Sequence, residues 1–317
     1  QIFKRRLVGG RMQDPGGVSS AECRACPRRC GVCRAGGERG YCGAPDGLVI
    51  ARAGLHFWEE PCISGERGSG AVFFSGCNLG CVFCQNHEIS RGGRGRRVTE
   101  DELIDEMRRL CGEGAHNINL VTPSHYAFRL AGLLRRWKPP VPVVWNSSGY
   151  DSIEALRALE GLVDVYLPDM KYMSAAMASR YSGAPDYPVV AADAIREMQR
   201  QTGAPRFGPD GMLLSGTIVR HLVMPENIVN TLEVIDWVDE QFPNGEVLFS
   251  LMAQYTPMPD MPFPELRRRV SEDEYSLVLE HLDESGIENG YVQELSAAGE
   301  EFIPGFDLRS DSDNDGN

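Results

Sequence analysis

The segment that decides the fold reads AVFFSGCNLGCVFC over residues 71–84. It starts with an apolar and aromatic run at 71–76, which is typical of a buried strand, and passes directly into a loop that carries Cys77, Cys81 and Cys84. A glycine within the loop lets the backbone turn back on itself, so three thiolates can surround one soft metal centre. A [4Fe–4S] cluster usually takes four cysteines. Three cysteines therefore predict a cluster with one iron left open, and a zinc site completed from elsewhere or three buried cysteines are the alternatives.

Strand-like runs continue along the chain after this loop. They alternate with amphipathic stretches of helical length, and this alternation favours a parallel sheet with right-handed crossovers. Such a sheet is either open and doubly wound or curved into a barrel, and in both cases the chemistry lies at the carboxyl ends of the strands. About six or seven units are too few for a complete barrel, so we predict an α/β fold with a partial (β/α)6 TIM-type barrel. The later strands are expected at 117–121, 141–146, 163–167, 217–224 and 246–252.

Three helices carry recognisable start signals. Thr99 with Glu102 and Ser271 with Glu274 have the spacing of a capping box, in which each side chain bonds the other residue's backbone amide. Asp151 is expected to open a third helix. These signals place helices directly after strands or loops of the predicted barrel.

The chain divides into three expected parts. Residues 1–70 are rich in Gly, Arg and Cys with little periodicity, which predicts a loop-dominated, cysteine-rich module that is organised by metal. Residues 71–308 form the barrel. Residues 309–317, RSDSDNDGN, are acidic and almost free of apolar side chains, so we expect a disordered tail.

The cysteine-rich module has its own ligand spacing. Its five cysteines are Cys23, Cys26, Cys30, Cys33 and Cys42. The spacing is too tight for a two-knuckle zinc ribbon, which separates its Cys pairs by about 15 residues. The pattern predicts a second metal centre, with iron–sulfur preferred to zinc.

Composition excludes several classes of function. The chain has 317 residues with 32 Lys+Arg and 45 Asp+Glu, for a formal charge of −13, which argues against binding nucleic acid. No apolar run reaches the ~18 residues that a membrane-spanning helix needs, so no membrane association is expected. Clustered cysteines without an export signal favour the reducing cytoplasm.

The loop and several later segments together resemble one family. FFSGCNLGCVFCQNHEIS, GAHNINLVTPSHY, NSSGYDS, VYLPDMKY and VRHLVMPE resemble the uncharacterised branch of the radical S-adenosylmethionine (radical SAM) superfamily that is related to pyruvate formate-lyase activating enzymes. The resemblance implies that Cys77, Cys81 and Cys84 hold a [4Fe–4S] cluster whose open iron binds S-adenosylmethionine. It also implies that Phe83 shields the cluster and adenine. In that superfamily one electron cleaves the bound cosubstrate to a 5′-deoxyadenosyl radical, which abstracts hydrogen.

The resemblance extends to polar residues at other strand ends. Asp169 and Lys171 are similar to the Asp-x-Lys of glycyl-radical activating enzymes, which implies that Lys171 meets the methionine carboxylate and that Asp169 helps hold a cation or the substrate. A solvated ion pair is the alternative. Asn146 and Ser147 stand where activating enzymes carry Asp-Thr-Asn-Gly, so they either bind ribose and methionine atoms or form a turn.

Two further strand ends offer candidates. Thr122 and Ser124 stand where many relatives carry Gly-Gly-Glu, and they could act as neutral acceptors for the methionine amino group, while His125 either reaches the substrate or caps a helix. Arg220 and His221 point to opposite faces of their strand, and an inward Arg220 would need an anionic partner such as a carboxylate of the methionine or the substrate. Gln254 and Tyr255 are weaker candidates of the same kind.

The resemblance also implies ligands and partners. It assigns Cys23, Cys26, Cys30 and Cys42 to the second centre and leaves Cys33 outside it. We expect an enzyme that takes electrons from a flavodoxin or ferredoxin and activates a glycyl radical protein. Radical modification of a small molecule or a peptide is the alternative. A non-enzymatic iron–sulfur electron-transfer protein is the hypothesis from a different class.

Overall fold

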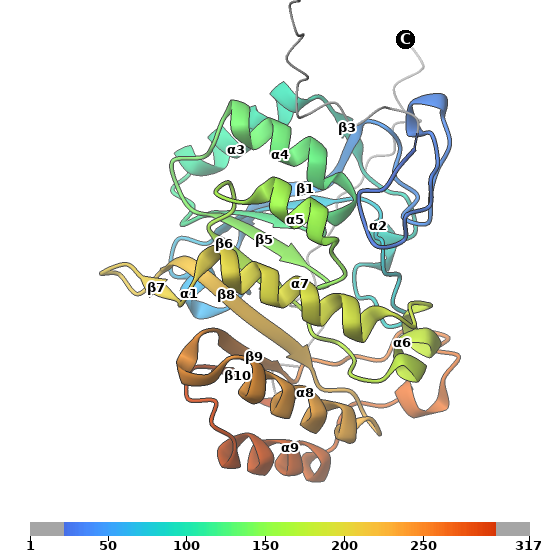
Figure 1. Cartoon of the computed structure of the whole chain (residues 1–317), viewed down its shortest axis with the longest axis vertical. Coiled ribbons are helices and arrows are strands. Elements are labelled where there is room, and N and C mark those ends of the chain that lie inside the picture. Colours follow the sequence, from blue (N-terminus) through green and yellow to red (C-terminus); the bar gives the residue numbers. More distant parts are fainter. Residues whose placement is uncertain (1–21, 296–317) are drawn as a thin grey trace, which may run out of the picture.

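The computed structural model describes residues 22–295. The expected acidic tail and the first part of the cysteine-rich module lie outside the described residues. Within them, a ten-stranded sheet runs in the order β10-β9-β8-β6-β5-β4-β2-β1-β3, with β7 paired to β8. The pairs from β2 to β10 along this order are parallel, and β1 is antiparallel to both of its neighbours. The protein therefore has an α/β fold with a mostly parallel central sheet (Figure 1).

All six predicted strands are present. They pair in chain order, which places their carboxyl ends at one edge of the sheet. Their bounds are β2 Ser69–Phe74, β4 Ile118–Val121, β5 Val143–Ser147, β6 Val165–Pro168, β8 Leu213–Leu222 and β9 Leu248–Met252.

Four strands were not predicted. β1, Leu48–His56, adds a nine-residue strand to a segment expected to be mostly loop, and it pairs with β2 and with β3, Arg96–Val98. Its sequence LVIARAGLH includes Arg, Ala and Gly, which weaken a strand signal. The short strands β7, Arg206–Phe207, and β10, Gly290–Val292, are formed by pairing with β8 and β9 rather than by local pattern.

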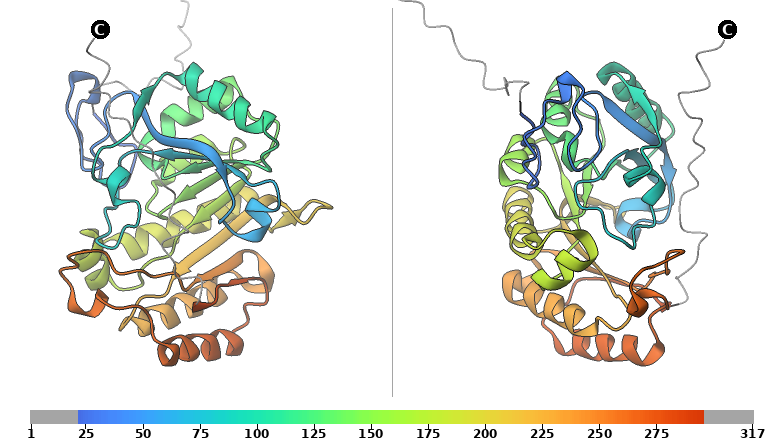
Figure 2. Two further views of the ribbon diagram at one scale, coloured as in Figure 1. Left: turned by 180° about the vertical axis from the view of Figure 1, so that it is seen from behind. Right: turned by 90° about the vertical axis from the view of Figure 1, so that its right-hand side faces the viewer.

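The longer helices cover one side of the sheet. In Figure 1 the helices from α3 to α9 follow one another down the molecule, and the view from behind in Figure 2 shows β1 crossing the opposite side. Neighbouring helices α4 and α5, α5 and α7, and α8 and α9 pack against each other. Their bounds are α3 Glu100–Gly112, α4 Ala127–Arg136, α5 Ile153–Leu159, α6 Ala175–Ser182, α7 Tyr187–Thr202, α8 Ile228–Gln241 and α9 Glu272–Glu284; two short helices are α1 Pro61–Ser64 and α2 His87–Ser90.

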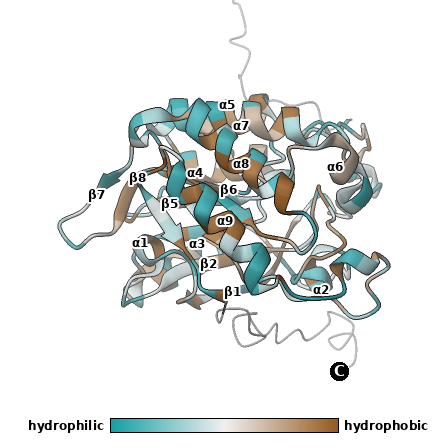
Figure 3. Ribbon diagram, turned by 90° about the horizontal axis from the view of Figure 1, so that it is seen from below, coloured by the Kyte–Doolittle hydropathy of each residue, from teal (hydrophilic) through white to brown (hydrophobic). Residues whose placement is uncertain are grey.

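The hydrophobic core has two large clusters between the long helices and the sheet, and a smaller cluster packs Cys62 and Ile63 of α1 against the strands. Every residue of β2, β4, β5 and β6 is buried, as expected for parallel strands that are covered on both faces. The helices carry hydrophobic residues on one side and hydrophilic residues on the other (Figure 3). No helix in the described part of the chain is long and apolar enough to cross a membrane.

Both predicted capping boxes are confirmed. Thr99 caps α3 and Ser271 caps α9, and each exchanges hydrogen bonds with the glutamate three residues later. The expectation for Asp151 was wrong, because Ser152 caps α5 and accepts a bond from the Ala155 amide. The carboxylate of Asp151 is instead buried among side chains at the end of β5.

Removing the α3 cap should cost a measurable part of the stability. In Thr99→Ala the Glu102 amide loses its acceptor at 3.2 Å, and we expect the free energy of unfolding to fall by about 1 kcal/mol. Thr99→Ser keeps the hydroxyl and serves as the matched control. Chemical denaturation of the three proteins measures the difference, and equal stability of the Ala and Ser variants would contradict the capping role.

Candidate functional site

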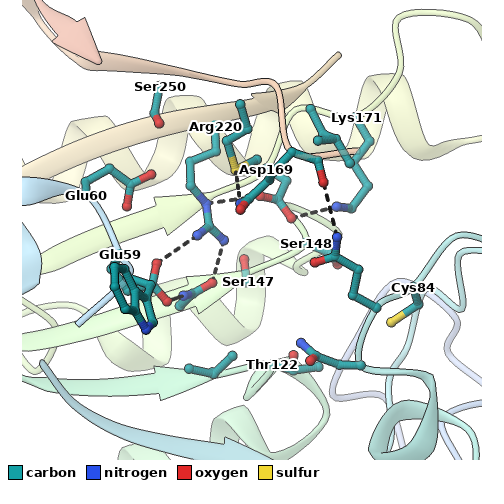
Figure 4. Close-up of a pocket in the computed structure, with 18 of the residues that line it drawn as sticks. Glu59, Glu60, Cys84, Thr122, Ser147, Ser148, Asp169, Lys171, Arg220 and Ser250 are labelled. Atoms are coloured by element: carbon teal, nitrogen blue, oxygen red, sulfur yellow. Dashed lines mark hydrogen bonds and ion pairs between the residues drawn. The ribbon is translucent and has the colours of Figure 1, made fainter. Parts of the chain in front are cut away.

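A cavity of about 520 Å³ opens at the carboxyl ends of the parallel strands. One part of its wall is the loop after β2, and the centre holds charged side chains from the segment that follows β6 and from β8 (Figure 4). A third part is formed by the segment after β1. The cavity brings together most of the predicted site residues, namely Cys77, Cys81, Phe83, Cys84, Thr122, Asn146, Ser147, Asp169, Lys171, Arg220 and Gln254.

The three loop cysteines line the same cavity. Burial raises the pKa of Cys84 to about 11, with further contributions from the nearby thiols of Cys77 and Cys81. Cys81 is also deeply placed, and burial raises its pKa against the attraction of Lys171. Three thiols from one loop that face one cavity are the donor set that a [4Fe–4S] cluster with one open iron requires. The loop therefore fits the cluster that its sequence predicts.

Within residues 22–295, no group of three or more His, Cys, Asp or Glu side chains is arranged to hold a metal ion. A [4Fe–4S] cluster places each ligand sulfur on a separate iron atom, so its cysteines need not converge on one point as the ligands of a single ion do.

The cysteine-rich module packs directly on the loop. The guanidinium of Arg28 donates to the carbonyl oxygens of Asn78 at 2.9 Å and Leu79 at 3.1 Å. Gly76 begins the loop with φ at +87°, and a Cβ at this position would lie 2.6 Å from the Cys42 carbonyl oxygen. A side chain at residue 76 would therefore clash with the module, and glycine also suits the left-handed backbone. The module and the loop fit together through backbone atoms.

A buried ion network crosses the centre of the cavity. Arg220 donates to Asp169 at 3.1 Å, to Glu59 at 3.0 Å and to Asn146 at 2.6 Å. Asn146 in turn donates to Glu59 at 3.0 Å, and Lys171 donates to Asp169 at 2.7 Å. Figure 4 shows Asp169 between the two cations. Arg220 points into the cavity, where its partners are two protein carboxylates, Asp169 and Glu59, and not the expected carboxylate of methionine or substrate.

The Asp169–Lys171 pair is not a solvated ion pair. Its side chains are 13% and 16% exposed. Burial alone would raise the pKa of Asp169, but Lys171 and Arg220 outweigh it and hold the pKa low. Burial would lower the pKa of Lys171, but Asp169 outweighs it and raises the pKa. Both shifts favour the charged forms of the two side chains.

The remaining candidates separate into two groups. Thr122 follows β4, lines the cavity and has φ at +58°, a strained backbone for a β-branched residue. Ser147 also lines the cavity, although its hydroxyl donates to Asp151 at 2.6 Å. Ser124 and His125 are buried outside the set of cavity-lining residues.

His125 has a structural position. Its Nε2 lies 2.9 Å from the Ser75 carbonyl oxygen, and burial lowers its pKa to about 3. The ring is therefore neutral and bonds the backbone that leads into the cysteine loop. His221 faces away from the cavity and contacts Met170 and Thr231, which confirms that Arg220 and His221 point in opposite directions. Tyr255 is buried and bonds the Leu266 carbonyl.

A known family model matches part of the chain. Residues 71–199 match the family model of the radical SAM superfamily. The matched segment carries the cysteine loop, Asp169 and Lys171, while Arg220 and Glu59 lie outside it.

Individual proteins are similar to this chain over longer stretches. The uncharacterized protein MJ0674 of Methanocaldococcus jannaschii is 29% identical over 270 residues, which cover 81% of this chain and 73% of that protein. SuiB of Streptococcus suis, solved with S-adenosylmethionine, matches with a TM-score of 0.50 and 12% identity over 71% of this chain. This match spans 50% of the SuiB chain, and it concerns the fold alone. A domain of pyruvate-formate lyase-activating enzyme from Bacteroides vulgatus reaches a TM-score of 0.38 with 13% identity, over 53% of this chain and 92% of that domain.

Sequence reasoning missed two carboxylates that precede the segment matching the radical SAM model. Glu59 and Glu60 precede the matched segment and follow an unpredicted strand, so neither motif nor periodicity gave them a role. Both line the cavity. Burial raises the pKa of each, and Arg220 opposes the shift. The only sequence feature at this position is a pair of adjacent acidic residues before a proline. It indicates a functional role only when the fold shows that both carboxylates lie near Arg220.

Glu60→Gln should stabilise the protein increasingly as the pH rises. The folded state holds the Glu60 proton more tightly than the unfolded state does, so stability is fully present below the ordinary carboxyl pKa. It is lost as the pH rises through the raised folded pKa. Glutamine cannot ionise and avoids this loss. Thermal unfolding from pH 4 to 8 should show a difference that grows with pH, and a difference independent of pH would contradict the assignment. Glu66→Gln, at an exposed position, is the control.

Proposed function

We propose that this protein is a radical SAM enzyme that reductively cleaves S-adenosylmethionine at a [4Fe–4S] cluster held by Cys77, Cys81 and Cys84. The observation that carries the proposal is that the three thiols of one loop line the same cavity as the buried Asp169–Lys171 pair. A cluster that binds S-adenosylmethionine needs both a trithiolate anchor and polar groups for the methionine end of the cosubstrate. The curved sheet serves as a partial barrel that holds these groups on rigid strand ends.

When bound, the cluster supplies one electron and an open iron site for cleavage of S-adenosylmethionine to methionine and a 5′-deoxyadenosyl radical that abstracts hydrogen from the substrate. Lys171 offers its ammonium to the methionine carboxylate, because Asp169 keeps it charged. Phe83, which is 6% exposed, excludes water beside the thiols. Thr122, Asn146 and Ser147 present hydroxyl and amide groups to the polar atoms of the cosubstrate.

Anaerobic reconstitution tests this activity directly. The protein is loaded with iron and sulfide, supplied with dithionite and S-adenosylmethionine, and assayed for 5′-deoxyadenosine. We expect 5′-deoxyadenosine to form in proportion to cluster content. A fully loaded protein that binds S-adenosylmethionine without cleaving it, or whose clusters ignore the cosubstrate in electron paramagnetic resonance, would overturn the proposal in favour of an electron-transfer protein.

We propose activation of a glycyl radical protein, by abstraction of hydrogen from a backbone glycine, as the first candidate reaction. Support comes from the resemblance of Asp169 and Lys171 to the Asp-x-Lys of such enzymes. A reduced flavodoxin or ferredoxin in the cytoplasm would supply the electron, in keeping with ten cysteines that are all free thiols. Deuterium placed on the glycine of a candidate partner should appear in 5′-deoxyadenosine. Transfer from a labelled small molecule or peptide instead would reassign the substrate.

We also propose a second metal centre at Cys23, Cys26, Cys30 and Cys42. The thiols of Cys42, Cys23 and Cys30 all act electrostatically on Cys26, which groups these four cysteines. The Arg28 amide bonds the Cys26 sulfur, and Arg34 donates to the Cys42 sulfur at 3.3 Å. Burial raises the pKa of Cys26 to about 12 and also raises that of Cys42, and these amide and guanidinium donors oppose the shifts by stabilising the thiolates, the form that binds metal.

Metal analysis of a triple variant isolates this second centre. Replacing Cys77, Cys81 and Cys84 with Ala removes the loop ligands, and we expect iron or zinc to remain bound. Adding Cys26→Ala should release that metal, whereas adding Cys33→Ala should leave most of it in place. Iron and zinc are quantified separately, so the experiment also identifies the metal. A triple variant that retains neither metal would refute the second centre.

A further inference from the structure

The part of the cavity beyond Arg220 has its own chemical character. Glu60 and Ser250 lie on one side of Arg220 (Figure 4), and Tyr291, on which Glu60 acts electrostatically, and Trp58 also line the cavity. Trp58 is 59% exposed although it lines the cavity, so this part reaches the surface. The proposed cleavage of S-adenosylmethionine, which is assigned to the loop cysteines and Lys171, uses none of these four side chains.

The charges around the cavity do not balance within the described residues. Three carboxylates, those of Glu59, Glu60 and Asp169, face two cations, Lys171 and Arg220. Both cations pair with Asp169, and Arg220 also pairs with Glu59. Glu60 forms no ion pair with any residue from 22 to 295. The cavity is therefore one positive charge short when its carboxylates are ionised.

Glu60, the carboxylate without an ion pair, is also buried. Its residue is 8% exposed, and its Oε2 has no hydrogen-bond partner among the described residues. Glu60 is the N-cap residue of α1, yet its side chain makes no capping bond. It lines the cavity instead, with its carboxylate facing the side of Arg220 (Figure 4). A buried carboxylate oxygen without a donor is costly, so a donor from a bound molecule would be favoured.

Arg220 attracts the Glu60 carboxylate without forming an ion pair with it, and the Ser250 side chain also stabilises the carboxylate. The other neighbouring groups within residues 22–295 supply no positive charge. Burial and then Arg52 lower the pKa of His56 to about 4, so this cavity-lining ring is neutral near pH 7. Glu60 also interacts electrostatically with Cys62 and Tyr291, but neither of these side chains carries a positive charge. The exposed indole of Trp58 can in addition attract a cation through its ring face.

We propose that the Glu60 end of the cavity is a substrate subsite that binds a cationic nitrogen, either an ammonium or a guanidinium group. The carboxylate accepts the charged hydrogen bond, and Trp58 covers the apolar stem that carries the cation. This inference rests on the proposed function in that it assigns the bound molecule the role of substrate. It narrows the substrate class to molecules or chain segments that carry an amine or a guanidine.

The test uses two probe pairs that differ in charge at nearly equal size. The first pair is n-pentylamine and 1-pentanol. The second is a capped pentapeptide with a central lysine and the same peptide with norleucine. Each is titrated by calorimetry into anaerobic, reconstituted enzyme saturated with S-adenosylmethionine, in the wild type, in Glu60→Gln and in the surface control Glu66→Gln. The two pairs distinguish a small-molecule source of the cation from a peptide source.

We expect the charged member of at least one pair to bind about tenfold or more tightly than its neutral partner, which is about 1.4 kcal/mol. Glu60→Gln should remove this preference, and Glu66→Gln should keep it. Equal binding of charged and neutral probes to the wild type would overturn the subsite, as would a preference that survives in Glu60→Gln. Weaker binding of S-adenosylmethionine itself in Glu60→Gln, with the probe preference intact, would assign Glu60 to the cosubstrate. Wild-type cleavage to 5′-deoxyadenosine, measured without probes, shows separately whether the proposed function holds.

Discussion

Cys81→Ala should reduce formation of 5′-deoxyadenosine to background. Cys81 is one of three thiols on a loop that offers no spare cysteine, so its loss leaves the cluster with two protein ligands. Changes in residues that merely support a metal ligand already cost about 10–100-fold, and loss of a ligand should exceed that. Anaerobic assays at equal protein concentration, with iron and sulfide content determined in parallel, measure the effect.

Cys111→Ala is the matched control for this prediction. Cys111 lies near the end of α3, is partly buried and does not line the cavity. Its loss should leave 5′-deoxyadenosine formation per cluster unchanged. Turnover in Cys81→Ala that matches Cys111→Ala would show that the loop is not the site of cleavage.

Arg220→Met should destabilise the fold by about 3–5 kcal/mol, because removing one partner of a buried ion network leaves the others uncompensated. Arg220 is 13% exposed and is the cation that joins Glu59 to Asp169. Methionine fills a similar volume, so the loss reports charge and hydrogen bonding more than packing. Chemical denaturation at neutral pH measures the change in the free energy of unfolding. At a pH low enough to protonate the carboxylates, the difference should shrink.

Arg108→Met controls for the loss of an exposed arginine. Arg108 pairs with Asp105 on the surface of α3, where the side chains are 57% and 71% exposed. Exposed pairs of this kind contribute little, so the free energy of unfolding should change by about 0.5 kcal/mol or less. Similar losses in both variants would contradict the importance of the buried network.

The strands that build the site could be predicted because their residues are apolar on both faces. The parallel strands β2, β4, β5, β6, β8 and β9 read as short, mostly hydrophobic runs, and each was predicted. β1 could not be predicted, because the run is interrupted by Arg52 and Gly54 and is stabilised by pairing with β2 along its length. Because β1 was not predicted, nothing in the sequence placed Glu59 and Glu60, which follow it, at the site.

Residues of the site were predictable where a motif fixed them locally. Cys77, Cys81 and Cys84 lie within eight residues of each other, and Asp169 and Lys171 are two apart. Asp151 was misjudged because a cap residue and a buried carboxylate look alike in sequence, and the choice depends on the hydroxyl of Ser147 four residues earlier. Ser124 was expected in the cavity but lies outside the residues that line it.

The sequence by itself determined the ligand loop, the order of strands and helices, and the edge at which polar residues gather, because spacing and periodicity are local properties of the chain. The tertiary structure alone decided which distant charges meet. Glu59 and Arg220 are 161 positions apart, and only the tertiary fold brings the Arg220 guanidinium within 3.0 Å of the Glu59 carboxylate. Buried charges must be neutralised by neighbours in space. That Glu60 has no ion-pair partner among the described residues can therefore be recognised only when the ion pairs of the folded chain are known.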